Sequence, residues 1–131
     1  MKSHKELKMS YVVVWIDSEQ AKLFTFNTAG VQKEELKRNA HEHNTNAQKG
    51  EHKESPEFYH RVAKHLAQPE ELLIVGPGMA KKHFKNEIEG HNKKLAESIV
   101  GCENMDHPTD AQIVAEARKF FTKHDLFTAL S

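Results

Sequence analysis

The part of this sequence that most restricts its fold is residues 72–88 (LLIVGPGMAKKHFKNEI). Its first four residues form an apolar run without polar alternation, which is typical of a strand buried on both faces in a parallel sheet. Gly76 and Gly78 permit a tight turn and a close approach of two backbones, and Pro77 breaks the strand. An amphipathic helical pattern follows at once. This unit predicts an α/β protein whose helices pack on a mainly buried sheet.

Three segments that precede this unit predict a meander of strands. Residues 11–16 (YVVVWI) are β-branched and aromatic, and residues 21–27 (AKLFTFN) follow a polar turn. Residues 31–38 alternate weakly and carry many charges, as expected of an edge strand that must avoid mispairing. The chain has 131 residues, enough for one core. We therefore expect a flexible basic tail over residues 1–9 and a single domain over residues 10–131.

Helices and one further strand complete the expected fold. The first helix lies between Ser55 and Pro69, and the second covers residues 79–89, where Gly90 is expected to end it. A strand over residues 98–103 is followed by a capping-box pattern and a last helix. The order β-β-β-α-β-α-β-α matches a ribonuclease-H-like α/β architecture. That architecture is a mixed five-stranded sheet with helices on both faces.

Composition restricts the partners and the compartment. The 19 Lys and Arg residues balance the 19 Asp and Glu residues, so binding to nucleic acid or to a membrane would need a local patch. The single cysteine, Cys102, excludes an intramolecular disulfide and is typical of a reducing compartment. No apolar run is long enough to span a bilayer, and none resembles a signal peptide. We expect a cytoplasmic protein that makes no membrane contact, and the sequence gives no oligomeric state.

Residues 39–54 (NAHEHNTNAQKGEHKE) lack large apolar residues and periodicity, which predicts an exposed loop. Loops of this length in compact domains are usually functional or disordered. The loop and the next helix hold five of the ten histidines, among basic residues that can contact RNA phosphates. The alternative is a solvated loop without a ligand, since acidic residues are mixed with the basic ones. The predicted RNA contacts in this region and at the second helix are Lys49, Lys53, Arg61, Lys64, Lys81 and Lys82.

The same residues offer two catalytic alternatives. His41, His43 and His52 could supply three ligands of an open zinc site, although no cysteine pair accompanies them. A two-metal nuclease site needs several carboxylates at the sheet, and only Asp17 and Glu57 are suitably placed. We therefore assign no catalytic residue, no cofactor and no resident metal, and expect a protein that is not an enzyme.

Two motifs give the sequence a family resemblance. The first is Gly-Pro-Gly at 76–78 with Lys-Lys-x-Phe at 81–84, and the second is DHPTDAQ at 106–112. Together with the surrounding sequence over residues 10–121, they resemble the middle domain of archaeal and eukaryotic class-one peptide release factors and of Pelota. The sequence looks closest to the bacterial relatives called translational machinery proteins. Neither motif is a catalytic signature.

The resemblance implies a role in translation. In release factors this domain carries a Gly-Gly-Gln loop that promotes hydrolysis of peptidyl-tRNA, and the corresponding residues 39–54 contain no Gly-Gly-Gln. Pelota also lacks the tripeptide and acts in ribosome rescue without hydrolysis. The resemblance thus implies a translation-associated module that binds the ribosome or tRNA without peptide release. The alternatives are a metal- or histidine-dependent hydrolase or nuclease, and a protein–protein interaction domain with no role on RNA.

Overall fold

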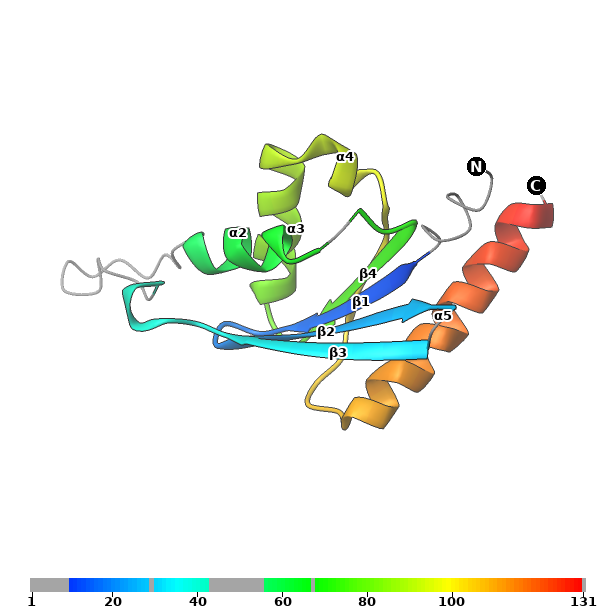
Figure 1. Cartoon of the computed structure of the whole chain (residues 1–131), viewed down its shortest axis with the longest axis horizontal. Coiled ribbons are helices and arrows are strands. Elements are labelled where there is room, and N and C mark those ends of the chain that lie inside the picture. The colour runs from blue at the N-terminus through cyan, green and yellow to red at the C-terminus, as the bar shows by residue number, and fades with distance from the viewer. Residues whose placement is uncertain (1–9, 29, 43–55, 67, 131) are drawn as a thin grey trace.

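The computed structural model of the chain describes residues 10–28, 30–42, 56–66 and 68–130, with only the backbone for His41 and residues 126–130. Figure 1 shows a mixed sheet of five strands in the order β3-β2-β1-β4-β5. The first three strands form an antiparallel meander, while β4 pairs in parallel with β1 and with β5. The strands are β1 (Tyr11–Ile16), β2 (Gln20–Asn27), β3 (Gly30–Lys37), β4 (Glu71–Gly76) and β5 (Ile99–Asn104).

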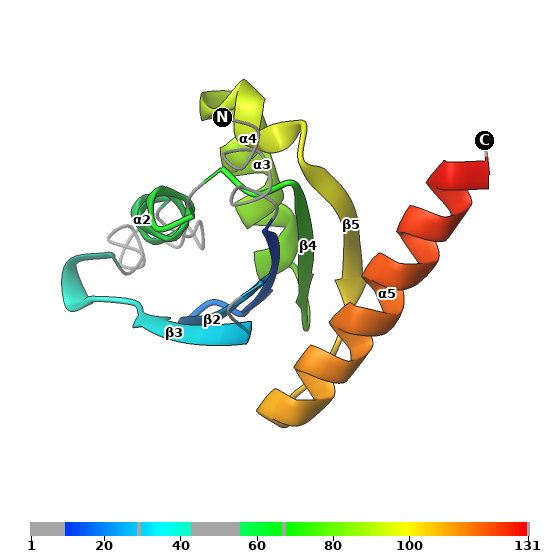
Figure 2. The same ribbon diagram turned by 45° about the vertical axis from the view of Figure 1, so that its right-hand side comes forward.

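Helices cover both faces of this sheet, which confirms the predicted fold class (Figures 1 and 2). One face carries α2, α3 and α4, and the opposite face carries α5. A short 3₁₀ turn, η1, follows β3. The bounds are η1 (Ala40–Glu42), α2 (Glu57–Lys64), α3 (Ala80–His91), α4 (Lys93–Ala96) and α5 (Asp110–Leu130). No helix among the described residues is long and apolar enough to cross a membrane.

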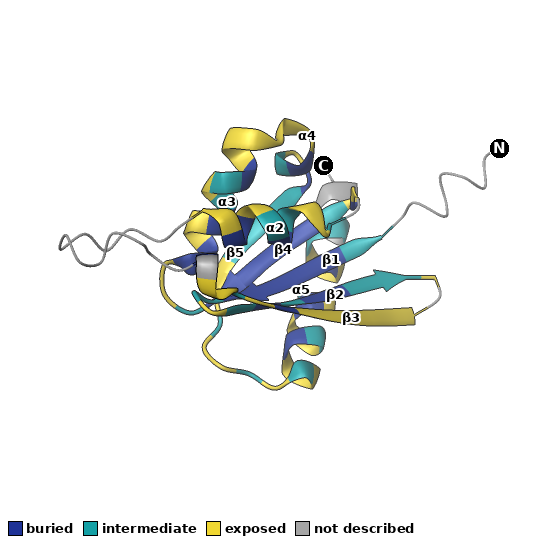
Figure 3. Cartoon of the chain, turned by 60° about the vertical axis from the view of Figure 1, so that its left-hand side comes forward, coloured by how far each residue is buried: buried dark blue, intermediate teal, exposed yellow. Residues whose placement is uncertain are grey.

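The central strand β1 contributes to two separate cores, because successive side chains of a strand point to opposite faces. Val12, Val14 and Ile16 pack beneath α2, α3 and α4. Val13 and Trp15 pack beneath α5. Figure 3 shows β1 and β4 as buried and β3 as an exposed edge. Burial on both faces explains why the sequences of the central strands lack polar alternation.

The start of α5 is closed by a reciprocal cap, as the sequence predicts. The backbone N–H of Thr109 donates to Oε1 of Gln112 at 2.8 Å, and the backbone N–H of Gln112 donates to Oγ1 of Thr109 at 3.1 Å. The indole N–H of Trp15 donates to the carbonyl groups of Met105 and Asp106, both at 3.1 Å. These contacts assign residues 105–112 a structural role.

The end of α3 differs from the prediction. The helix continues through Gly90 to His91, so the expectation that Gly90 ends it is wrong. Asn92 ends the helix instead, because its backbone N–H donates to the Ile88 carbonyl at 2.8 Å and its side chain accepts from Leu95 N–H at 3.0 Å. The stabilisation gained when one residue ends a helix and caps the next is larger than the modest free-energy cost of a glycine inside a helix. The predicted tail, residues 1–9, lies outside the described residues.

Candidate functional site

The candidate site lies at one edge of the sheet, where the parallel strands β1 and β4 end. β3 ends at the same edge, since the backbone N–H of Arg38 donates to the carbonyl of Glu19 in the turn after β1. We call this region the carboxyl edge, and it consists of residues 17–19, 38–42 and 76–79. In open α/β sheets, ligands usually bind outside the carboxyl ends of the parallel strands.

A buried carboxylate organises the corner between β3 and α2. The side chain of Glu42 is 3% exposed and forms a two-pronged ion pair with Arg61. Nε of Arg61 donates to Oε2 of Glu42 at 2.8 Å, and Nη2 donates to Oε1 at 2.9 Å. Such forked pairs are among the stronger hydrogen-bonded arrangements in proteins. The hydrogen bonds to Glu42 raise the pKa of the Arg61 guanidinium.

A second guanidinium, that of Arg38, holds the same corner. Its Nη1 donates to the backbone carbonyl of Glu42 at 2.6 Å, and its Nε donates to the carbonyl of Ser18. Its planar group lies over the rings of Phe58 and Tyr59 on α2, at 4.8 Å and 5.3 Å from the ring centres. We call Arg38, Glu42 and Arg61 the arginine clamp. It joins the end of β3 to α2, on either side of residues 43–55 in the sequence.

The clamp changes the role expected for Arg61. The sequence predicts this residue as an RNA contact, whereas its guanidinium donates to Glu42 and to the carbonyl of Lys37 at 2.5 Å. The sequence provides no reason to assign Glu42 or Arg38 a role in the site. Glu42 stands in a polar segment whose composition predicts exposure, so no local signal marks it as buried.

The turn after β4 brings two backbones together, as its glycines predict. Gly76 has φ +155° and Gly78 has φ +61°, both in regions that glycine occupies readily. A Cβ atom on Gly76 would overlap the carbonyl oxygen of Ile16 at the end of β1. The close contact of β1 with β4 at the carboxyl edge therefore depends on this glycine.

The two lysines at the start of α3 have different environments. Lys81 is 3% exposed, and its ammonium donates to the carbonyl of Gly78 at 2.5 Å. Lys81 is one of the predicted RNA contacts, but its side chain is buried because it folds back over the preceding turn. Lys82 is exposed, as is Lys64 on α2. Neither Lys64 nor Lys82 makes an ion pair with any described residue.

The other predicted site residues fall partly outside the described chain. His60 pairs with Glu87 at 3.2 Å and His65 with Glu34 at 2.9 Å, so both contact carboxylates of neighbouring elements. Only the backbone is described for His41, so the predicted zinc site stays a prediction. The predicted residues that lie outside the described ranges are His43, Lys49, His52 and Lys53.

The carboxylates considered for a nuclease site have structural surroundings. Oδ1 of Asp17 accepts the backbone N–H groups of Glu19 and Gln20 at 2.8 Å and 2.9 Å, which makes Asp17 a turn former. Glu57 is exposed in the first turn of α2. In the described part of the carboxyl edge, no three His, Cys, Asp or Glu side chains place their ligand atoms within 4.8 Å of one another.

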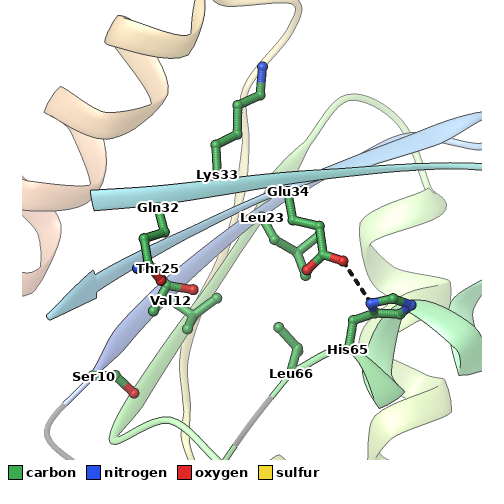
Figure 4. Close-up of a pocket in the computed structure, with 9 residues that line it drawn as sticks. All are labelled: Ser10, Val12, Leu23, Thr25, Gln32, Lys33, Glu34, His65 and Leu66. Carbon is green, nitrogen blue, oxygen red and sulfur yellow. Dashed lines mark hydrogen bonds and ion pairs between the residues drawn. The ribbon is translucent and has the colours of Figure 1, made fainter. Parts of the chain in front are cut away.

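A separate cavity of about 400 Å³ lies between β2, β3 and the end of α2 (Figure 4). Val12, Leu23 and Leu66 give it an apolar floor. The ion pair of Glu34 with His65 borders it on one side, at 2.9 Å. No residue of the carboxyl edge and none of the predicted RNA contacts lines this cavity, so it is separate from both.

The sequence matches no protein-family model, and no curated protein matches it. Solved structures match its fold. Pelota from Archaeoglobus fulgidus matches with a TM-score of 0.65 at 15% identity, over 97% of this chain and 38% of Pelota. The archaeal translation termination factor aRF1 matches with a TM-score of 0.57 at 15% identity, over 92% of this chain and 41% of that protein. Dom34 from S. cerevisiae, a translation termination-like factor, matches with a TM-score of 0.50 at 15% identity, over 95% of this chain and 41% of Dom34.

These likenesses show the fold. This chain spans about two fifths of the length of the three solved structures. The fold that they share with it agrees with the resemblance to release factors and Pelota found in the sequence.

Proposed function

We propose that this chain is a translation-associated module that binds ribosomal RNA or tRNA without releasing peptides, through exposed lysines of α2 and α3 and through lysines of residues 39–54. The observation that carries this proposal is the fold shared with Pelota and aRF1 over more than nine tenths of the chain. Of these proteins, aRF1 is a translation termination factor and Dom34 is involved in RNA quality control pathways. The absence of Gly-Gly-Gln from residues 39–54 is the reason to propose binding without hydrolysis.

The proposed RNA contacts are lysines with no carboxylate partner among the described residues. Lys64 on α2 and Lys82 on α3 are exposed on two helices that pack together through Tyr59 and Phe84. Lysine ammonium groups contact phosphate oxygens without reading sequence. Lys49 and Lys53 join the proposed set from the sequence alone. We leave out Arg61 and Lys81, because their cationic groups bond within the protein.

Co-sedimentation with ribosomes over a series of salt concentrations tests this proposal. The wild-type protein is expected to pellet with ribosomes at low salt and to be released as salt rises, because each phosphate contact releases bound counterions. Replacing both Lys64 and Lys82 with alanine should weaken binding at low salt. It should also lower the salt slope by about one per lysine lost.

The matched control changes two exposed lysines on the opposite face of the sheet, Lys119 and Lys123 of α5. It removes the same charge and should leave pelleting unchanged. Equal losses in both double variants would contradict the proposed surface. Binding that is insensitive to salt and to ribonuclease would instead support a protein–protein interaction domain.

A further inference from the structure

The edge of the sheet opposite the carboxyl edge carries a cluster with no part in the proposed function. Glu71 is the first residue of β4, and His124 and Asp125 lie in α5. Among the described residues, these three side chains are the only group of potential metal ligands whose atoms all lie within 4.8 Å of one another. We propose that Glu71, His124 and Asp125 bind one divalent transition-metal ion of the zinc class.

The distances between the potential ligand atoms fit a tetrahedral centre. Nδ1 of His124 lies 3.5 Å from Oε1 of Glu71 and 3.7 Å from Oδ1 of Asp125. Zinc bonds of about 2.0–2.2 Å to nitrogen and oxygen place tetrahedral ligands roughly 3.3–3.6 Å apart. The two distances from His124 lie in or close to this range, and the two carboxylate atoms lie within 4.8 Å of each other. The fourth position would be open to water, as in zinc sites with three protein ligands.

The surroundings hold the ligands in this arrangement. The hydroxyl of Tyr11 on β1 donates to Oδ2 of Asp125 at 2.6 Å. The other carboxylate oxygen of Asp125, Oδ1, faces Nδ1 of His124. The ring of Phe120 stacks on the imidazole of His124, with centres 6.2 Å apart and planes 11° apart. Carboxylates and imidazoles that bind metals are typically held in place by such neighbouring groups.

The charges of the cluster are compatible with a cation. Oε1 of Glu71 is buried and accepts no hydrogen bond from any described residue. Two carboxylates that face each other in a partly buried place repel unless a proton or a cation lies between them. A divalent ion neutralises both. One imidazole with two carboxylates favours zinc-class ions over magnesium and calcium, which prefer oxygen ligands alone.

Titration of the full chain with Zn²⁺, and with Co²⁺ as a spectroscopic probe, tests the site. One ion per chain is expected, with the visible bands of tetrahedral Co²⁺, and no comparable binding of Mg²⁺ or Ca²⁺. The variants Glu71→Gln and Asp125→Asn keep the side-chain shapes and should weaken Zn²⁺ binding at least tenfold. Tyr11→Phe removes only the outer hydrogen bond and is expected to weaken binding about tenfold. Thermal unfolding followed by circular dichroism verifies that each variant is folded.

The matched control addresses the histidines of residues 39–54. Replacing His41, His43 and His52 together with alanine should leave the stoichiometry and the Co²⁺ spectrum unchanged. Loss of binding in this triple variant would overturn the proposal. Wild-type affinity in folded Glu71→Gln and Asp125→Asn variants, or no Zn²⁺ binding by the wild type, would overturn it too. Because no ribosome is involved, failure here would leave the RNA-binding proposal untouched.

Discussion

Replacing Gly76 with alanine is expected to lower the free energy of unfolding by more than about 4 kcal/mol, a loss that few domains of this size tolerate. The added Cβ atom would overlap the carbonyl oxygen of Ile16, which belongs to the neighbouring central strand. The backbone at Gly76 also has φ +155°, a conformation that other residues rarely adopt. Removing this overlap would require moving β1 away from β4. Such a movement would disturb the packing on both faces of the sheet, because both strands are buried on both faces. Urea unfolding followed by the fluorescence of the buried Trp15 measures the change.

Two other glycines provide the controls. Gly78 has φ +61° with open space around a Cβ atom, so Gly78→Ala should cost only the strain of that conformation, about 1–2 kcal/mol. Gly90 lies inside α3 with nothing near a Cβ atom, and Gly90→Ala should stabilise the protein by about 0.5–1 kcal/mol. A Gly76→Ala variant no less stable than Gly78→Ala would show that the contact between β1 and β4 is not tight.

Removing the Arg61 side chain is expected to give the second largest loss in the free energy of unfolding, about 2–3 kcal/mol. Arg61→Ala takes away the guanidinium that faces the buried carboxylate of Glu42. Breaking a buried pair by removing one partner typically costs about 3–5 kcal/mol. We expect a smaller loss for Arg61→Ala, because the Arg61 side chain is 30% exposed and so only partly removed from water, although that of Glu42 is 3% exposed.

A double-mutant cycle separates the ion pair from other effects. If Glu42 and Arg61 act together, the double variant Glu42→Ala/Arg61→Ala should be destabilised by clearly less than the sum of the single variants. Lys64→Ala serves as the control, because Lys64 is an exposed cation on the same helix and should leave the urea midpoint unchanged. Additive single effects would show that the clamp does not stabilise the corner.

The fold followed from the sequence wherever local chemistry determines local structure. The apolar runs at 11–16 and 72–75 predict buried central strands, and the charges of residues 31–38 predict the exposed edge strand. The glycines at 76 and 78 predict the close approach of two backbones. Gly90 does not end α3, because the cap at Asn92, two residues further along, competes with it for the helix end.

The site was harder to predict, because its contacts join residues far apart in the sequence. Glu42 is buried only because Arg61 reaches it from the next helix, and nothing in a polar segment indicates such a partner. Exposure of Lys64 and Lys82 agrees with helical spacing, whereas Lys81 turns back onto the preceding turn. Glu71 and His124 belong to different elements, and no motif relates them.

The arginine clamp has a practical consequence for protein engineering. It fastens β3 to α2 with residues that all lie outside 43–55, so exchanging the peptide between these two anchor points leaves the contacts of the clamp in place. The entropic cost of closing a loop rises only slowly with its length. Foreign peptides of different lengths should therefore be tolerated at this position, and the domain becomes a scaffold for displaying them.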